Sequence, residues 1–585
     1  MLYDFPIPPS LVKKLLYADD ITIYVSVKNP LDAETILQPF IVKISLWGRK
    51  WKFKFSGEKS AAVVFTRAYK PGDDPLLFID GQRIRTVSDF KLLGVTFDYK
   101  LRWHKHIAAV VEGCSRLKSL FSIIAKTRYG PPVKTLMQLY KSLVQSRIDY
   151  GVIAYGNASK SVIERINVVS RAILRLILGS RASTPTQVIY AESGVTPVRQ
   201  RRRWLAANYL MKLSHNPNNS TYESAYTIFH GNKDLPLSST PCVAYDLQVL
   251  KRLKLKIFSI EPDYNQQVSI RSPSEAPVCE TLWFPMSKRR AVASRSVVMS
   301  HFQELVASLP SSALLIYTDG SLSQEKERSS CAVFIPSLSI SRSWLLKKGS
   351  SVFLAELNGI RQALQIIYDM DSSSEEIVLF SDSKTSIQAV LSHLPPTNPC
   401  IPEIHNLLRC LKATGTKVTL IWIPSHTGII GNETADNLAS RECLHPSGNK
   451  IRNMLSAAEQ IGIFRSQWMA EWIHCLQVCK KTTVRIRENM RRINWHFSPD
   501  RRVNISLHRL RSEHTYLNAF LHRIDQNADP SCRRGCEALE NVQHVLLDCR
   551  SLDEHRRKIV SFFSSNSLHL DLTSLLGLNL QIPVS

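Results

Sequence analysis

Apolar and polar positions repeat with different periods along the chain, and the changes of period divide it into segments. Short apolar runs flank an acidic turn in residues 12–24, and further strand-like runs follow at 61–66 and 89–99. The apolar residues then begin to recur every three or four positions, which is typical of amphipathic helices. We therefore predict a small segment of strands at 1–105 and a helical segment at 106–215.

The second half of the chain begins with a stretch that has no sustained period. Residues 216–312 carry many turn formers, such as the run Asn-Pro-Asn-Asn-Ser, and we expect a linker with some local structure. Strands and helices alternate clearly over 313–445, which is typical of an α/β domain. A basic helical connector is expected at 446–520, a compact Cys/His module at 521–560 and a plain tail at 561–585. The pattern predicts a multidomain protein of mixed α+β and α/β class.

Composition narrows the range of functions. The chain has 585 residues, and Lys and Arg total 75 against 49 Asp and Glu, so the formal net charge is +26. A surplus of this size favours a polyanionic partner, either a nucleic acid or an acidic membrane surface. We expect no secretory signal, no membrane-spanning segment and no disulfide scaffold, because the start is not basic and the 12 cysteines are scattered. The sequence predicts an intracellular protein of the nucleus or cytoplasm.

Four acidic residues occupy related positions in the α/β block. One predicted strand ends in Asp319 and another in Asp382, while Glu356 lies in the first turn of a predicted helix and Asp436 on a later helix. Acids at the carboxyl ends of neighbouring strands converge in an open α/β sheet. We therefore expect the four carboxylates to share one site, although strand-end aspartates are also common as turn and cap residues.

A shared site of four carboxylates calls for cations. Like charges at short range would protonate some of the acids, and divalent ions relieve that conflict. Hard oxygen ligands with positions left for water and phosphate are typical of magnesium. Two such ions about 4 Å apart can activate a water and stabilise the leaving oxygen of a phosphodiester displacement. The residues thus predict a two-magnesium phosphodiesterase site.

The motifs of this block resemble those of ribonuclease H type 1 domains, in the same order. They are Tyr-Thr-Asp-Gly-Ser, Ala-Glu-Leu, Ser-Asp-Ser and Trp-Ile-Pro-Ser-His-Thr-Gly-Ile-Ile-Gly-Asn-Glu-Thr-Ala-Asp. The resemblance implies a mixed five-stranded sheet and cleavage of the RNA strand of RNA–DNA hybrids. It also implies that Asp319 bridges both ions, that Glu356 and Asp382 hold the ion on the leaving-group side, and that Asp436 holds the ion beside the attacking water.

Three further residues follow from the same resemblance. His426 corresponds to a mobile histidine thought to assist proton transfer or product departure, and the alternative is an ordinary loop histidine. Asn432 and Glu433 begin the last helix and can be read as simple caps. The substrate would be distinguished by its 2′-hydroxyl groups, with basic surface holding phosphates.

The amino-terminal segment resembles the reverse transcriptases of non-LTR retrotransposons. The acidic turn Tyr17-Ala-Asp19-Asp20 lies between two short apolar runs and precedes a set of residues that fit the family pattern: Trp51, Phe53, Phe55, Lys59 and Phe65. The resemblance implies a partial palm followed by a helical thumb or connection. Polymerases of this type need an upstream aspartate and fingers, yet only sixteen residues precede Tyr17. We therefore expect a truncated palm with vestigial Asp19 and Asp20, and no polymerase activity unless another chain supplies the missing segments.

The carboxyl-terminal module contains four residues that could bind a metal. Cys532, Cys536, His544 and Cys549 offer the ligands of a tetrahedral zinc site. Chains of this retroelement group often end in a Cys-Cys-His-Cys motif, although three residues rather than the usual two separate the first pair. The alternatives are a zinc knuckle and isolated reduced thiols. The basic run at 199–203 fits a nuclear import signal, a nucleic-acid track or an exposed helix face.

Together these features resemble a fragment of a jockey-like non-LTR retrotransposon polyprotein. The expected function is Mg²⁺-dependent endonucleolytic cleavage of RNA in RNA–DNA hybrids, with two magnesium ions as cofactors, zinc as a second metal, and no membrane partner. The rival hypothesis is a catalytically inactive remnant that binds nucleic acid and cuts nothing.

Overall fold

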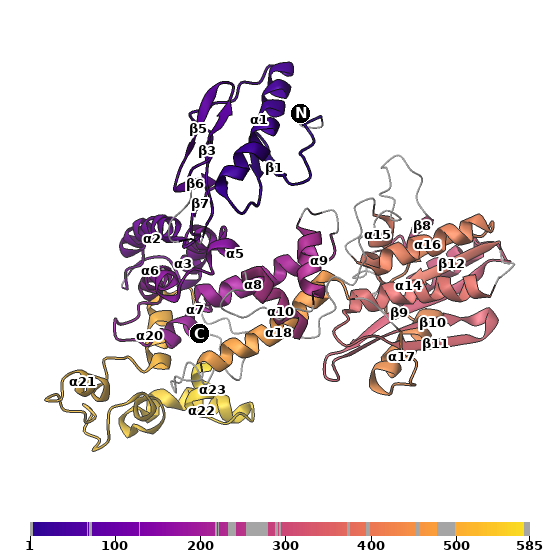
Figure 1. The fold of residues 1–585 in the computed structure, drawn as a ribbon. Helices are drawn as coiled ribbons and strands as arrows, with labels where there is room; N and C mark the ends of the chain where they lie inside the picture. Colours follow the sequence, from indigo (N-terminus) through magenta and orange to yellow (C-terminus); the bar gives the residue numbers. More distant parts are fainter. Residues whose placement is uncertain are drawn as a thin grey trace. The chain divides into compact units, whose positions relative to one another are not determined.

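The fold is taken from a computed structural model, which divides into two compact units. Unit 1 comprises residues 1–203 and 471–585, and unit 2 comprises residues 204–470. The structure describes residues 4–66, 68, 73–127, 129–216, 219, 221–231, 242–252, 279–286, 291, 294–370, 375–392, 398–451, 455–476 and 498–577. Figure 1 shows the elements of both units, each of which is described by itself below.

Unit 2 is built on a six-stranded mixed sheet. In spatial order its strands are β11 (Ile340–Leu345), β10 (Arg328–Ile335), β9 (Leu314–Ser323), β12 (Glu376–Ser381), β13 (Lys417–Trp422) and β8 (Glu280–Trp283). The first three pair antiparallel as a meander, whereas β9, β12, β13 and β8 run parallel. The central strands are buried on both faces, which explains why they read as continuous apolar runs.

Helices cover both faces of this sheet. They are α13 (Arg295–Ala307), α14 (Val352–Asp369), α15 (Lys384–Leu391), α16 (Cys400–Ala413) and α17 (Ile430–Leu444). Helix α14 packs on β9 and α16, and its apolar stripe of Leu357, Ile360 and Leu364 is fully buried in the core. Helix α17 packs against β9, β10 and β11 from the opposite side of the sheet (Figure 1).

The sheet has one strand more than the five that we predicted. The extra strand, β8, comes from the stretch expected to be a linker and pairs parallel with the edge of β13. Its four residues are too few to show a period, so the pattern of apolar positions did not predict this strand. Helix α13 of the same stretch also joins the core, where the ring of Phe302 meets that of Phe380 edge-on at 5.5 Å.

A second cluster in unit 2 is purely helical. Helices α9 (Tyr222–His230) and α10 (Cys242–Arg252) pack with Trp468 of α18 (Ala457–Leu476), whose ring lies 5.4 Å from that of Trp204. Much of the predicted linker therefore forms packed helices. Residues 217–218, 220, 232–241, 253–278, 287–290 and 292–293 of this stretch lie outside the described residues.

The amino-terminal part of unit 1 contains small strands and one long helix. Strands β1 (Lys13–Tyr17) and β2 (Asp20–Tyr24) form a hairpin, and α1 (Pro30–Lys50) buries Phe40, Ile41 and Ile44 in a local core. The other strands are β3 (Ala61–Ala62), β4 (Leu77–Ile79), β5 (Gln82–Thr86), β6 (Asp89–Leu92) and β7 (Val95–Asp98).

Residues 104–213 are almost entirely helical, in agreement with their three- and four-residue period. The elements are α2 (His104–Ile124), α3 (Val133–Leu139), the π-helical turn η1 (Tyr140–Gln145), α4 (Ser146–Asp149), α5 (Val152–Tyr155), α6 (Lys160–Leu178), α7 (Thr186–Ser193) and α8 (Val198–Leu213). Leu136, Tyr140 and Val144 are buried as the pattern predicts, whereas Leu143 is exposed.

The carboxyl-terminal part of unit 1 docks on these helices. Helix α20 (Arg501–Ser512) begins with Arg501, whose guanidinium donates four hydrogen bonds to backbone carbonyls. Two of these carbonyls belong to the last turn of α6, and two belong to the residues that directly follow α2. The same helix places Arg511 against Glu192 of α7, with two hydrogen bonds of 2.8 and 2.9 Å. Because helix carboxyl ends carry unpaired carbonyls, the Arg501 contacts cap two helices at once.

The chain continues into the Cys/His module. Its elements are α21 (Asn518–Ile524), the π-helical turn η3 (His544–Asp548), the 3₁₀ turn η4 (Arg550–Leu552), α22 (Asp553–Ser565) and α23 (Leu572–Gly577). The predicted plain tail therefore contains helix up to Gly577, because Phe563 and Leu576 are buried. Residues 477–497 of the predicted connector and 578–585 of the tail lie outside the described residues. Among the described helices, none combines the length and the apolar character needed to cross a bilayer.

Candidate active site

Two of the predicted site residues lie at the meeting point of neighbouring strands. Strands β9 and β12 are parallel, and Thr318 pairs with Ser381 in their register. Asp319 follows the first of these residues and Asp382 the second, so both carboxylates leave the sheet at the same edge. The pairing of β9 with β12 ends at these residues, which brings together two acids that are 63 positions apart in the sequence. Strand β9 itself continues to Ser323 along β10, so Asp319 lies within its strand and not at its end as we expected.

Glu356 reaches the same place from helix α14. It is the fifth residue of this helix, one turn later than the first-turn position that we expected. The helix approaches β9 closely at Gly320, where a Cβ atom would lie only 2.4 Å from the backbone nitrogen of Glu356. Any side chain at position 320 would push the helix away. The glycine after Asp319 is therefore what allows Glu356 to meet Asp319 and Asp382, and ligand atoms of these three acids lie within 4.8 Å of one another.

Burial and mutual repulsion disfavour the charged forms of these acids. Asp319 is 5% exposed and Glu356 is 6% exposed. Burial, followed by the charges of Asp382 and Asp436, raises the pKa of Asp319 to about 8 against an opposing hydrogen bond from Gly320. Burial, together with Asp319 and Asp382, raises the pKa of Glu356 well above its ordinary value. Within the described residues, the buried Oε2 atom of Glu356 has no hydrogen-bond partner.

The fourth predicted acid, Asp436, forms a second group beside the first. Its ligand atoms lie within 4.8 Å of those of His426 and Glu433. The Nδ1 atom of His426 is 3.5 Å from Oδ2 of Asp436, and the histidine is largely exposed in a left-handed backbone conformation with φ of 57°. The charge of Asp436 also acts on Asp319 and Glu356, so all four acids share one electrostatic environment.

Two residues that we treated as helix caps have contacts within the site. Glu433 accepts a hydrogen bond from the backbone nitrogen of Gly428 at 3.1 Å, which ties the start of α17 to the loop that carries His426. Asn432 donates from Nδ2 to Oδ2 of Asp382 at 3.4 Å. A spacing signal existed for Glu433, because residues three apart on a helix share a face and Asp436 lies three residues later.

This arrangement suits divalent cations. Its metal-ligating atoms are carboxylate oxygens, the ligands that hard ions such as Mg²⁺ prefer. Among the described residues the buried Oε2 of Glu356 has no hydrogen-bond partner, so this atom can still bind an ion. Binding of a cation would favour the charged forms of Asp319 and Glu356 and so reverse their raised pKa values. The residues present therefore fit a metal site.

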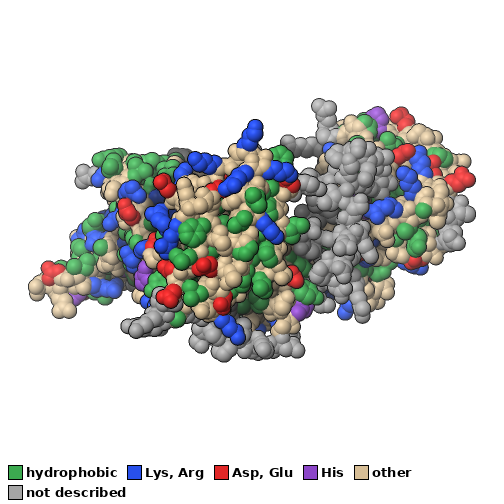
Figure 2. All heavy atoms as spheres, turned by 45° about the horizontal axis from the view of Figure 1, so that its top comes forward, with side chains coloured by type: hydrophobic (Ala, Val, Ile, Leu, Met, Phe, Trp, Pro, Cys, Tyr) green, Lys and Arg blue, Asp and Glu red, His purple; other side chains and the backbone are tan. Residues whose placement is uncertain are grey.

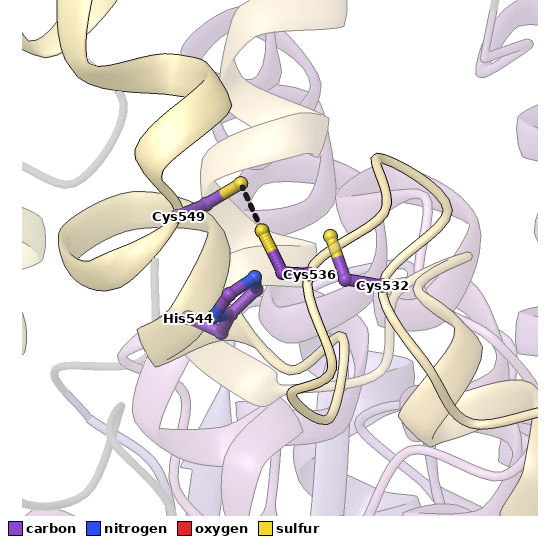
Figure 3. Close-up of side chains that lie close together, drawn as sticks. All are labelled: Cys532, Cys536, His544 and Cys549. Atoms are coloured by element: carbon purple, nitrogen blue, oxygen red, sulfur yellow. Dashed lines mark hydrogen bonds between the residues drawn. The ribbon is translucent and has the colours of Figure 1, made fainter.

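The four Cys/His residues of unit 1 converge on one point (Figure 3). The sulfurs of Cys536 and Cys549 are 3.7 Å apart, too far for a disulfide. Two sulfurs on one tetrahedral zinc, each at about 2.3 Å, lie about 3.8 Å apart. The buried Nε2 of His544 has no hydrogen-bond partner among the described residues. The amide of Arg534, with a smaller contribution from His544, lowers the pKa of Cys532 to about 7, whereas the hydrogen bond with Cys549 raises the pKa of Cys536.

The two acids of the amino-terminal turn lie in a different setting. Asp20 pairs with Tyr17 at the end of the β1–β2 hairpin, and Ala18 and Asp19 form the turn, with Ala18 at φ of 50°. Within the part of the chain that the structure describes, Asp19 and Asp20 belong to none of the groups of three or more metal-ligating side chains.

The basic run at 199–203 is part of α8 and is largely engaged. Arg201 forms an ion pair with Asp149 at 2.6 Å, Arg203 pairs with Glu471 at 2.9 Å, and Arg202 is buried. An exposed helix face is therefore the wrong description of this run as a whole. Figure 2 shows Lys and Arg side chains spread over the visible surface among neutral and apolar residues.

One region of the chain matches a known protein family. Residues 311–444 match the family model of RNase H. The chain thus carries a ribonuclease H domain, which contains all four acids as well as His426.

Part of the chain is homologous to RNA-directed DNA polymerases of non-LTR retrotransposons. It is 28% identical over 202 residues to the RNA-directed DNA polymerase from mobile element jockey of Drosophila melanogaster, and 26% identical to that of Drosophila funebris. Each match covers 34% of this chain and 22% of the relative. The probable RNA-directed DNA polymerase from transposon X-element of Drosophila melanogaster is 26% identical over 181 residues, or 30% of this chain and 20% of the relative. The matched regions thus span about a fifth of these relatives, and the homology is consistent with a fragment of a jockey-like polyprotein.

Proposed function

We propose that the ribonuclease H domain cuts the RNA strand of RNA–DNA hybrids by Mg²⁺-dependent hydrolysis. The observation that carries this proposal is the gathering of Asp319, Glu356 and Asp382, two of them buried and with raised pKa values. Buried acids without a protein cation suit a site that receives its cations from solution. The family match and the homology to RNA-directed DNA polymerases support a hybrid as the substrate.

The division of the acids into two adjacent groups supports separate roles. Asp319 lies with Glu356 and Asp382, while its pKa also responds to Asp436. In our proposal Asp319 binds both ions, Glu356 and Asp382 bind the ion on the leaving-group side, and Asp436 binds the ion beside the attacking water. A pair of bound magnesium ions supplies an activated water and charge stabilisation at the leaving oxygen.

His426 is proposed to move a proton at its ring nitrogens or to help the product depart. The side chain is exposed and faces Asp436, so it can change position without disturbing the core. The alternative, an ordinary loop histidine, predicts that His426→Ala leaves the cleavage rate unchanged.

The test is cleavage of an end-labelled RNA–DNA hybrid by the purified full chain in Mg²⁺. We expect RNA fragments from the wild-type protein and none from Asp382→Asn. The matched control is Asp369→Asn, an exposed aspartate at the far end of α14, about 20 Å along the helix from Glu356. Equal cutting by wild type and Asp382→Asn, or no cutting by either, contradicts the proposal.

The net charge of +26 favours a second candidate, a remnant that binds nucleic acid without cutting it. Salt-dependent hybrid binding with no RNA fragments at any Mg²⁺ concentration would favour this candidate. Primer extension by the chain alone is not expected, because Asp19 and Asp20 lie in a turn and join none of the metal-ligating groups found among the described residues.

We further propose that Cys532, Cys536, His544 and Cys549 bind one zinc ion. The support is the convergence of the four side chains and the spacing of their sulfurs. Metal analysis of protein purified with zinc should give one ion per chain, and Cys549→Ser should lose it. Cys475→Ser, at an exposed cysteine outside the group, should keep it. Equal zinc content in both variants contradicts the assignment. The nuclear or cytoplasmic location stays a prediction.

A further inference from the structure

The edge of the sheet that carries Asp382 continues into a row of aromatic residues. In the register of the parallel strands, Ser381 of β12 pairs with Trp422 of β13, and Trp422 pairs with Trp283 of β8. Adjacent strands lie about 4.8 Å apart, so Trp283 stands about 10 Å from the residue that precedes Asp382. The sixth strand therefore places an indole ring next to the candidate active site.

The two indole rings of this row have different exposures and partners. Trp422 is 7% exposed and donates from Nε1 to the carbonyl of Asp382 at 3.0 Å, which fixes it against the site. Trp283 is 41% exposed. The edge strand β8 thus presents Trp283 to solvent, while Trp422 lies buried on the neighbouring strand β13.

A lysine completes the patch. The Nζ atom of Lys384 lies 5.4 Å from the ring centroid of Trp283 and 5.7 Å from that of Trp422. Lys384 is the first residue of α15 and is exposed, two positions after Asp382. Among the described residues, no carboxylate lies within ion-pair distance of its ammonium group. A cation above an exposed aromatic ring is thus open to an anion from outside.

This combination selects a ligand that is both anionic and flat. An ammonium group contacts phosphate as a point charge, and an indole stacks on any base or packs on a sugar without reading sequence. A nucleic-acid strand offers both features within one nucleotide. An acidic peptide would satisfy the lysine but would leave the indole without a flat partner.

We propose that Trp283 and Lys384 form a binding subsite for the nucleic-acid strand next to the scissile position. Lys384 contacts a phosphate, Trp283 stacks on the adjoining nucleotide, and Trp422 positions both by its bond to the Asp382 backbone. The assignment rests on the proposed hybrid substrate. It adds two substrate-binding residues, of which Trp283 lies outside the matched residues 311–444.

The first test measures hybrid binding in EDTA, where cleavage plays no part. Fluorescence anisotropy of a labelled hybrid should show that Trp283→Ala weakens binding by roughly 5- to 150-fold, the range expected for one aromatic stack. Trp283→Phe should keep most of the affinity. Lys384→Gln should reduce the slope of log affinity against log salt by about one phosphate contact.

Matched controls come from the opposite edge of the sheet. The control variants are Tyr368→Ala and Lys412→Gln. Tyr368 lies near the end of α14, before β12 begins, and Lys412 lies near the end of α16, before β13 begins. Both side chains are exposed, and both variants should bind the hybrid as wild type does. Equal losses in test and control variants would overturn the proposal, as would unchanged binding by Trp283→Ala and Lys384→Gln. If Trp283→Ala misfolds by circular dichroism, the exposed Lys384→Gln still decides the question.

A second test reports on the indole directly. In protein labelled with 5-fluorotryptophan, the ¹⁹F resonance that disappears in Trp283→Phe belongs to Trp283. Addition of hybrid in EDTA should shift or broaden that resonance, and an acidic peptide should not. A response to the peptide alone, or to neither ligand, overturns the assignment. Because neither test requires turnover, a protein that binds through Trp283 but does not cut would refute only the nuclease proposal.

Discussion

Buried acids occur in both units of the molecule, and their surroundings are opposite. In unit 1, Glu192 is fully buried with two hydrogen bonds from Arg511 and with His508 at 3.5 Å. Burial alone would raise the pKa of Glu192, but the charge of Arg511, followed by the hydrogen bond with His508, outweighs burial and lowers that pKa. In unit 2, Asp319 and Glu356 are buried beside other acids, and their pKa values rise.

The difference separates an acid in a structural ion pair from the acids of the proposed metal site. Where the protein itself supplies the cation, the resulting ion pair links two elements of the fold, here α7 and α20. A protein that gathers acids without one keeps a site that is unfavourable until an ion arrives from solution, since like charges in low dielectric repel strongly. The following predictions test this contrast, from the largest expected effect to the smallest.

Asp319→Asn should lower the rate of hybrid cleavage by roughly a thousandfold or more, because the proposed bridging ligand is lost. The same substitution should raise the melting temperature of the metal-free protein, because one of the repelling charges disappears. Cleavage assays and thermal unfolding in EDTA measure the two effects. A destabilised Asp319→Asn protein would break the comparison, since it would mean that this acid has a structural partner.

Glu192→Gln should have the opposite effects: it should destabilise the protein and leave the cleavage rate unchanged. Leaving Arg511 buried without its carboxylate should lower the free energy of unfolding of unit 1 by about 3–5 kcal/mol, with no change in the cleavage rate below the melting temperature. Chemical denaturation followed by circular dichroism measures the loss. The control is Glu164→Gln, because the Glu164 side chain is 48% exposed in its ion pair with Arg171, and this pair should contribute less than about 1 kcal/mol. Equal losses would contradict the assigned role of Glu192.

The two regions should respond to pH with opposite signs. Asp319 has a folded-state pKa near 8, above its value in the unfolded chain, so metal-free unit 2 should lose stability as pH rises towards 8, by about 1–3 kcal/mol from pH 5.5. Glu192 has a lowered pKa, so its contribution is present above pH 4.5 and is lost as pH falls through the lowered value.

Thermal unfolding at several pH values with and without Mg²⁺ tests these signs. Magnesium should stabilise unit 2 most at high pH, because its ligands must be deprotonated. In Asp319→Asn the slope of stability against pH should become shallower. A magnesium effect that is independent of pH would argue against binding by these acids.

Glu433→Gln should have the smallest effect, a reduction in cleavage rate of about tenfold. Its carboxylate holds the Gly428 amide and so positions the His426 loop, a role that the amide side chain can partly fill. Kinetic assays at saturating hybrid measure the change. The loss should be greater in Glu433→Ala, and equal rates in both variants would show that the contact has no positioning role.

The sequence was informative wherever local pattern and chemistry coincide. The four acids follow or face predicted strands, so their convergence could be predicted from the rule for strand ends. The strand β8 could not be predicted, because four residues carry no period and its pairing with β13 is decided by a neighbour 139 positions away. The ion pair between Glu192 and Arg511 was equally hidden, since 319 positions separate its members.

The ion pair between Glu192 and Arg511 also affects when unit 1 can fold during synthesis of the chain. Unit 1 is assembled from both ends of the sequence, while unit 2 lies between them. At about 5–20 residues per second, Arg511 leaves the ribosome roughly 15–60 s after Glu192. During that interval the nascent helices lack the Arg511 guanidinium beside Glu192 and the Arg501 contacts after α2 and at the end of α6. The first third of the polypeptide therefore completes its fold only after the ribonuclease H domain has been translated.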